Sequence, residues 1–102
     1  MGSVSLEMEV KHEAGQHLRP AALFVQTAAA FGSDIKVRNV TRGTPFRDAK
    51  SALGVMMLGV SHGHTIGLEA QGDDAQAAID ALKALIEDNF GETGASAPEG
   101  QA

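Results

Sequence analysis

The sequence contains no cysteine, no tryptophan and no tyrosine, and phenylalanine occurs only four times. The lack of cysteine excludes disulfide bonds, thiolate nucleophiles and cysteine-ligated zinc sites. An RNA-binding open-faced sandwich needs aromatic side chains on its sheet together with a basic surface. The scarcity of aromatic residues therefore argues against that class of protein.

Positive charge and long apolar runs are also scarce. Eight lysines and arginines face 13 acidic residues, giving a formal net charge of -5, which disfavours non-specific binding to a nucleic-acid backbone. No apolar stretch approaches the roughly 18 residues that a membrane span requires, and no basic-plus-apolar leader precedes a cleavage site. We therefore expect a cytoplasmic protein that neither binds nucleic acid nor inserts into a membrane.

The length of the chain favours a single domain. A chain of 102 residues, 43% of them hydrophobic, can form one compact core but is too short for two ordinary domains. Residues 93–102 lack large apolar side chains and are rich in glycine, alanine and serine, so burial cannot offset the entropy cost of ordering them. We expect one domain at residues 1–92 and a flexible C-terminal tail at residues 93–102.

Hydrophobic periodicity predicts four strands and three helices. Apolar and polar residues alternate, as in half-buried strands, at residues 6–10, 35–37 and 66–70, and Phe46 indicates a further short strand. Helical spacing predicts helices at about residues 18–31, from Ser51 to Gly59, and from a capping Asp73 or Asp74 to residues 90–91. The order β-α-β-β-α-β-α implies an α+β open-faced sandwich, with an antiparallel or mixed sheet and the helices on one face.

The chemistry of the sequence is concentrated where the first helix should begin. His17 lies at the mouth of that helix, whose first N–H groups have no intrahelical partner and can bind an anion. Neutral imidazole is nucleophilic, the Arg19 guanidinium can donate to phosphate oxygens, and Pro20 stiffens the turn. These residues suit the transfer of a phosphoryl group to and from His17 without a metal ion, although a histidine near a helix start is more often a cap or a surface residue.

Two motifs give the chain a resemblance to a known family. The motif Gly-x-His-x-Arg-Pro-Ala-Ala at residues 15–22 resembles the active-site motif of HPr, the phosphocarrier of the bacterial phosphoenolpyruvate-dependent sugar phosphotransferase system. The residues at 48–51, 54–56 and 58–59 resemble the second HPr motif, and the likeness extends over about residues 5–92. The resemblance implies an HPr-like fold, with a four-stranded antiparallel sheet and three helices on one face.

The resemblance also implies a function. His17 would accept a phosphoryl group on Nδ1 from phosphorylated enzyme I, with phosphoenolpyruvate as the ultimate donor, and pass it to the sugar-specific enzyme IIA components of enzyme II. Arg19 would stabilise the phosphoryl group. The carrier would act as a monomer, without a cofactor, and as a covalent intermediate rather than a free-standing enzyme. The alternative is an HPr-like regulatory interaction module that does not support sugar transport.

Ser51 has a structural and a regulatory interpretation. Its hydroxyl should cap the second helix, a contribution of about 1 kcal/mol. In many HPr proteins the matching serine is also phosphorylated by an HPr kinase/phosphorylase, which slows transfer to the histidine. By the same resemblance, partner docking would involve a set of apolar and basic residues, whereas Met57 and Leu58 should belong to the core. The docking set is Leu18, Pro20, Lys50, Leu53 and Met56.

Several positions depart from the usual HPr pattern. Gln16 and Leu18 flank the histidine where an apolar and a small residue are usual, and Ala52 reduces the apolar docking patch. The turn at residues 41–45 is longer than usual, and we expect it to lie away from the active site with little functional effect. The two histidines at positions 62 and 64 indicate a solvated turn rather than a metal site, because no cysteine or carboxylate cluster accompanies them.

Overall fold

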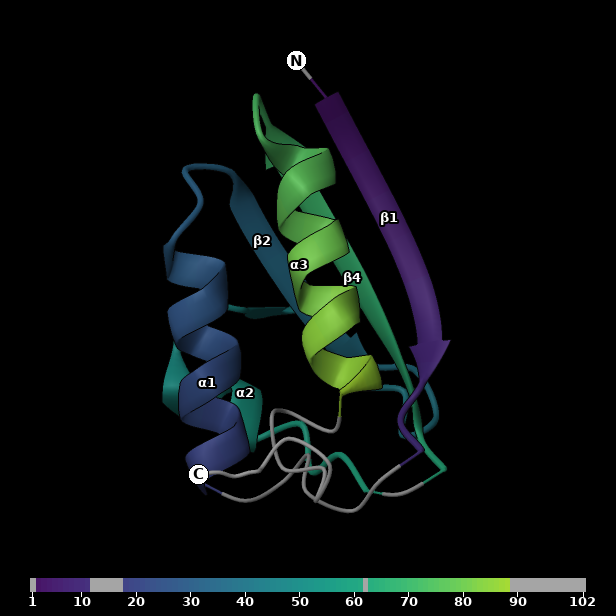
Figure 1. The fold of residues 1–102 in the computed structure, drawn as a ribbon. Coiled ribbons are helices and arrows are strands. Elements are labelled where there is room, and N and C mark those ends of the chain that lie inside the picture. The colour runs from purple at the N-terminus through teal and green to yellow at the C-terminus, as the bar shows by residue number, and fades with distance from the viewer. Residues whose placement is uncertain (1, 12–17, 62, 89–102) are drawn as a thin grey trace.

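The computed structural model describes residues 2–11, 18–61 and 63–88, and confirms the predicted order of elements (Figure 1). The strands are β1 (Gly2–Glu9), β2 (Asp34–Asn39), β3 (Arg47–Asp48) and β4 (Thr65–Gly72). The helices are α1 (Leu18–Ala29), α2 (Ala52–Met56) and α3 (Ala75–Glu87). None of these helices is both long enough and apolar enough to cross a membrane. The expectations about residues 12–17, His62 and the tail lie outside the described residues.

The strands form one antiparallel sheet in the order β1-β4-β2-β3. In the middle of the sheet, Leu68 of β4 pairs with Leu6 of β1 on one side and with Val37 of β2 on the other. Because successive side chains of a strand point to opposite faces, this register places the apolar set of each strand on one face. Figure 1 shows the helices against that face, which leaves the other face open, as predicted.

The two longer helices bury the apolar stripes that the sequence predicts. In α1, Ala21, Phe24 and Ala28 are buried at helical spacing. In α3 the buried residues are Ala75, Ala78, Ile79, Leu82 and Ile86, while its acidic side chains are exposed. Helix α1 ends at Ala29 rather than near Phe31, because the N–H groups of Ala30 and Phe31 bond three residues back, which tightens the last turn.

Asp74 is the N-cap residue of α3, as one of the two predicted aspartates, but its side chain makes no capping hydrogen bond to the helix. The carboxylate instead accepts hydrogen bonds from the Ser33 hydroxyl and from the N–H groups of Gly32 and Ser33, at 2.9 and 3.0 Å. These donors, the hydroxyl most strongly, lower the pKa of Asp74. The side chain therefore joins the start of α3 to the segment before β2.

The third strand also differs slightly from its prediction. It consists of Arg47 and Asp48, so Phe46 immediately precedes it. The Phe46 side chain is 40% exposed, and the Arg38 guanidinium lies 5.1 Å from the centre of its ring. A cation over an aromatic face is a favourable contact at this distance. Phe46 therefore packs against an arginine of the open sheet face instead of pairing within the strand.

Candidate functional site

The described start of α1 bears on the proposed phosphorylation site. Helix α1 begins at Leu18, the residue that follows His17 in the sequence, and Arg19 and Pro20 belong to its first turn. His17 itself lies outside the described residues. A proline costs no hydrogen bond in a first turn, because the first four N–H groups of a helix have no intrahelical acceptor. The predicted helix start next to His17 is thus confirmed.

Ser51 caps α2, as the sequence predicts. Its backbone is extended, and its Oγ accepts a hydrogen bond from the Gly54 N–H at 3.1 Å. The cap satisfies one of the N–H groups that the first turn of a helix leaves unpaired. Ser51 is half-buried at the start of α2, with Lys50 before it and Ala52 after it.

Lys50, a predicted docking residue, has a structural contact in the folded chain. Its Nζ donates a hydrogen bond to the carbonyl of Phe31 at 2.8 Å, just beyond the end of α1. Carbonyl groups near the end of a helix carry partial negative charge, so a cation is favourable there. Lys50 therefore ties α2 to α1, and its ammonium group is only partly available to a partner.

The described part of α2 presents an exposed apolar surface, which we call the α2 surface. It consists of Leu53, Met56 and Met57, whose exposed fractions are 72%, 37% and 53%. The prediction that Met57 belongs to the core is wrong, whereas Leu58 is buried as predicted. Helix α2 has only five residues, so it buries Val55 and turns Met57, its C-cap, toward solvent.

Asn39 is a buried polar residue that the sequence reasoning missed. Its Nδ2 donates to the carbonyl of Leu58 at 3.0 Å and lies 3.0 Å from Nδ1 of His64, while its Oδ1 accepts from the Arg42 N–H at 3.1 Å. The side chain is fully buried, so these partners replace water. The sequence pattern could have predicted this burial, because Asn39 continues the every-second-residue alternation of Ile35 and Val37, whose side chains point to the core.

His64 corrects the prediction of a solvated turn. It is half-buried, and its Nδ1 accepts a hydrogen bond from the Ser61 N–H at 3.2 Å as well as facing the Asn39 amide. Both neighbours present donor groups to Nδ1, so the ring is held by two hydrogen-bonding contacts instead of facing solvent on that side. Within residues 2–11, 18–61 and 63–88, no group of three or more histidine, cysteine or acidic side chains could hold a metal ion.

The long turn after β2 reaches the segment that ends α2. Nη1 of Arg42 donates to the carbonyl of Leu58 at 3.2 Å, the same carbonyl that accepts from Asn39. The guanidinium lies over Gly59, whose φ of +59° and missing side chain make room for it. The turn that we expected to have little functional effect thus places a cation over Gly59, two residues after Met57 of the α2 surface.

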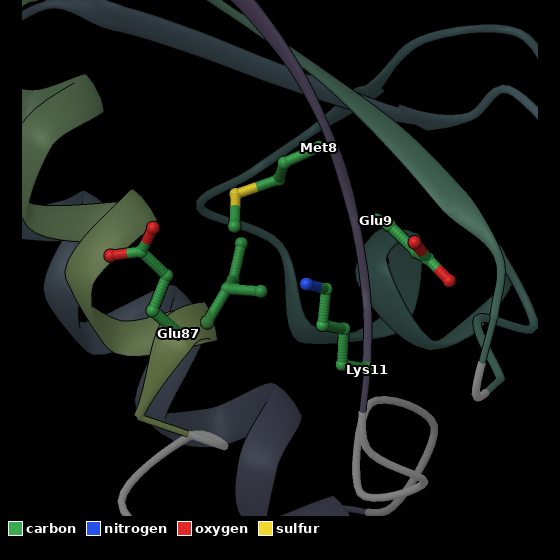
Figure 2. Close-up of a pocket in the computed structure, with 5 residues that line it drawn as sticks. Met8, Glu9, Lys11 and Glu87 are labelled. Carbon is green, nitrogen blue, oxygen red and sulfur yellow. The ribbon is translucent and has the colours of Figure 1, made fainter.

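A separate hollow of about 530 Å³ lies between the end of β1 and the last turn of α3. Its lining residues are Met8, Glu9, Lys11, Ile86 and Glu87. In Figure 2, Met8 and Lys11 point toward α3, whereas Glu9 projects on the other side of β1. None of the site residues predicted from the sequence lines this hollow.

The comparisons with known proteins agree with this geometry. Residues 4–88 match the family model described as "PTS HPr component phosphorylation site". The chain belongs to the HPr family. The match includes every site residue predicted from the sequence, and nearly all of the described fold.

Several HPr-family relatives share much of the chain. Over 78 residues, 76% of this chain and 84% of the relative, it is 46% identical to the phosphocarrier protein HPr of Cupriavidus necator. It is 43% identical to the HPr-like protein Crh of Halalkalibacterium halodurans, with 82% of this chain and 96% of the relative covered. The crystal structure of HPr-C-His from Thermoanaerobacter tengcongensis superposes with a TM-score of 0.78 at 48% identity, covering 91% of this chain and 99% of the other.

Longer relatives contain an HPr-like part within a larger chain. The multiphosphoryl transfer protein of Haemophilus influenzae is 35% identical over 97 residues, and that of Vibrio cholerae is 40% identical over 83 residues. The chain spans about a fifth of the length of these relatives, 19% and 21%. The HPr fold therefore occurs both as a small protein and as part of a longer one.

Proposed function

We propose that this HPr-family chain is a phosphocarrier that accepts a phosphoryl group on His17 from phosphorylated enzyme I, with phosphoenolpyruvate as the ultimate donor. The group then passes to enzyme IIA components. The observation that carries the proposal is the start of α1 at the residue after His17, because the first N–H groups of a helix have no intrahelical partner and can bind an anion. Arg19 in the same turn adds a cation for the phosphoryl oxygens.

The transfer conserves atoms and charge without a metal ion. The unprotonated ring nitrogen, Nδ1 in HPr proteins, attacks phosphorus while the bond between phosphorus and the donor breaks, and the donor keeps that electron pair. The Arg19 guanidinium and the N–H groups of α1 stabilise the charge on the phosphoryl oxygens. The reverse attack, by a nucleophile of the enzyme IIA component, regenerates the free imidazole.

The α2 surface supplies the docking contacts in this proposal. Leu53, Met56 and Met57 together expose an apolar group large enough to anchor a partner. Met57 joins the docking set because it is exposed, whereas Lys50 contributes less than its sequence position suggests, since its Nζ bonds Phe31.

The test is phosphorylation of the full-length protein. We expect incubation with enzyme I and labelled phosphoenolpyruvate to give an acid-labile, alkali-stable label, which is characteristic of phosphohistidine. Omission of enzyme I is the control and should give no label. A wild-type protein that stays unlabelled with active enzyme I would contradict the carrier function.

A second, regulatory element of the proposal concerns Ser51. A phosphate there adds about -2 charge beside the α2 surface and disturbs apolar docking. We expect HPr kinase and ATP to give an acid-stable label on the wild-type protein, and Ser51→Ala to remove it. The control is Ser3→Ala, an exposed serine of β1, which should keep the label. We also expect the modified protein to accept phosphoryl groups from enzyme I more slowly. If Ser51→Ala keeps the acid-stable label, the serine is a helix cap only.

The Crh relatives favour one alternative, a regulatory module that does not serve sugar transport. Their similarity covers 82% and 83% of this chain, almost as much as the family match. The two tests separate the alternatives. An acid-stable label on Ser51 without an acid-labile label from enzyme I would favour the regulatory module, whereas the acid-labile label favours the carrier.

A further inference from the structure

The turn that follows β2 is held by hydrogen bonds to Asn39 and Thr65. The backbone N–H of Asn39 donates to Thr44 Oγ1 at 2.9 Å, and its carbonyl accepts from the Thr44 N–H at 3.1 Å. Its Oδ1 accepts from the Arg42 N–H at 3.1 Å. On the other side, Thr41 Oγ1 accepts from the Thr65 N–H at 2.8 Å. The backbone of Arg42 is thus fixed by strands β2 and β4.

The side chain of Arg42 is positioned as well. It crosses Gly59, where any side chain would collide with Nη1, and it donates to the carbonyl of Leu58 at 3.2 Å. Among the residues that the structure describes, this carbonyl is the only acceptor for the guanidinium. Arg42 is exposed, so the remaining N–H groups of its guanidinium can reach a partner. Their planar arrangement matches the two oxygens of a carboxylate.

Few charged side chains lie in the segments that surround the α2 surface. Residues 21–33, which contain most of α1, carry no charged side chain, and within residues 49–61 the only one is Lys50. The Lys50 Nζ is bonded to the Phe31 carbonyl, whereas the Arg42 guanidinium bonds one carbonyl and has further N–H groups to offer a partner. An apolar patch with an available cation nearby suits a partner surface that combines apolar side chains with a carboxylate.

We propose that Arg42 is a specificity-determining residue of this HPr-family carrier, and that it pairs with a carboxylate of the protein that docks on the α2 surface during phosphoryl transfer. The inference rests on the proposed function. A pair at the rim of an interface steers encounter and selects partners more than it adds affinity. The long turn therefore adds to the docking surface a cation that comes from outside α1 and α2.

The experiment compares two variants that lose the same charge. Arg42→Gln removes the docking cation, whereas Arg38→Gln removes a cation on the opposite face of the sheet, where Arg38 contacts Glu7 at 3.8 Å and the Phe46 ring. With enzyme I and phosphoenolpyruvate at low salt, we expect Arg42→Gln to raise the KM for the carrier about threefold to tenfold and leave kcat unchanged. Arg38→Gln should match the wild type.

Two further measurements separate docking from a purely structural role. Arg42→Lys keeps the charge and should bring the KM most of the way back to the wild-type value. The difference in KM between wild type and Arg42→Gln should shrink near 1 M salt, where the Debye length is only about 3 Å. Thermal unfolding of each variant verifies that it is folded at the assay temperature.

Each outcome has one interpretation. Equal KM values for Arg42→Gln and Arg38→Gln, or a KM that Arg42→Lys does not restore, would overturn the role of Arg42 while the carrier function stands. An effect of Arg42→Gln that does not depend on salt would do the same. A wild-type protein that takes no label from enzyme I would remove the proposed function itself.

Discussion

Replacing His17 with alanine abolishes the acid-labile label that enzyme I and phosphoenolpyruvate place on the protein. The imidazole is the nucleophile of the proposed transfer, so its removal leaves no atom to form the bond to phosphorus. The expected loss is complete rather than partial, because Arg19 and the N–H groups of α1 stabilise charge but cannot accept the group. The measurement is label per protein at saturating donor, with the stability of the label in acid and alkali.

The matched controls for His17→Ala are other histidines of the same chain. His12→Ala should keep the full label, and His64→Ala should keep it whenever the variant is folded, because Nδ1 of His64 bonds Ser61 and Asn39 instead of facing a substrate. Acid-labile label that persists in His17→Ala, or disappears only in His12→Ala, would assign the phosphorylation to another residue.

Asn39→Ala lowers the free energy of unfolding by about 2 to 4 kcal/mol, since it removes several buried hydrogen bonds at once and leaves a small cavity. The Arg42 N–H loses its acceptor, and the Leu58 carbonyl and His64 Nδ1 each lose a donor. Urea denaturation at neutral pH measures the change. Hydrogen exchange should also be faster at the amides of residues 42–44, where the turn loses its anchor.

Lys36→Ala is the control for the Asn39 variant. Lys36 lies on the same strand but points to the open face, so its removal should change the free energy of unfolding by less than about 0.5 kcal/mol. Equal losses for the two variants would mean that the side-chain hydrogen bonds of Asn39 contribute nothing beyond strand β2 itself.

Much of the fold followed from short patterns. The alternation at residues 66–70 predicted a half-buried strand, and Ile66, Leu68 and Ala70 are indeed buried in β4. The position of Ser51 just before an apolar run was enough to predict its capping hydrogen bond, because a cap bonds an N–H only three residues along the chain. Such features depend on backbone geometry and neighbours along the chain, and the sequence records both.

The errors concern side chains whose partners are distant in sequence. Asp74 had the sequence context of a helix cap, but its carboxylate accepts hydrogen bonds from the N–H and the hydroxyl of Ser33, 41 residues away, instead of from the first turn of α3. Met57 had the apolar character of a core residue, but the short α2 turns it outward. His64 had the glycine neighbours of a solvated turn, but Asn39 faces its ring.

The sequence by itself determined the order of the elements, the apolar face of each and the motif that places His17 next to the start of α1. Local sterics and hydrogen bonding set those features, so residues close together in the chain suffice to predict them. Only the tertiary structure decided that Asn39 holds Leu58, 19 residues away, and that Arg42 lies over Gly59, in the segment that follows α2. These contacts depend on how the sheet and α2 pack together, because that packing brings distant donors and acceptors within bonding distance.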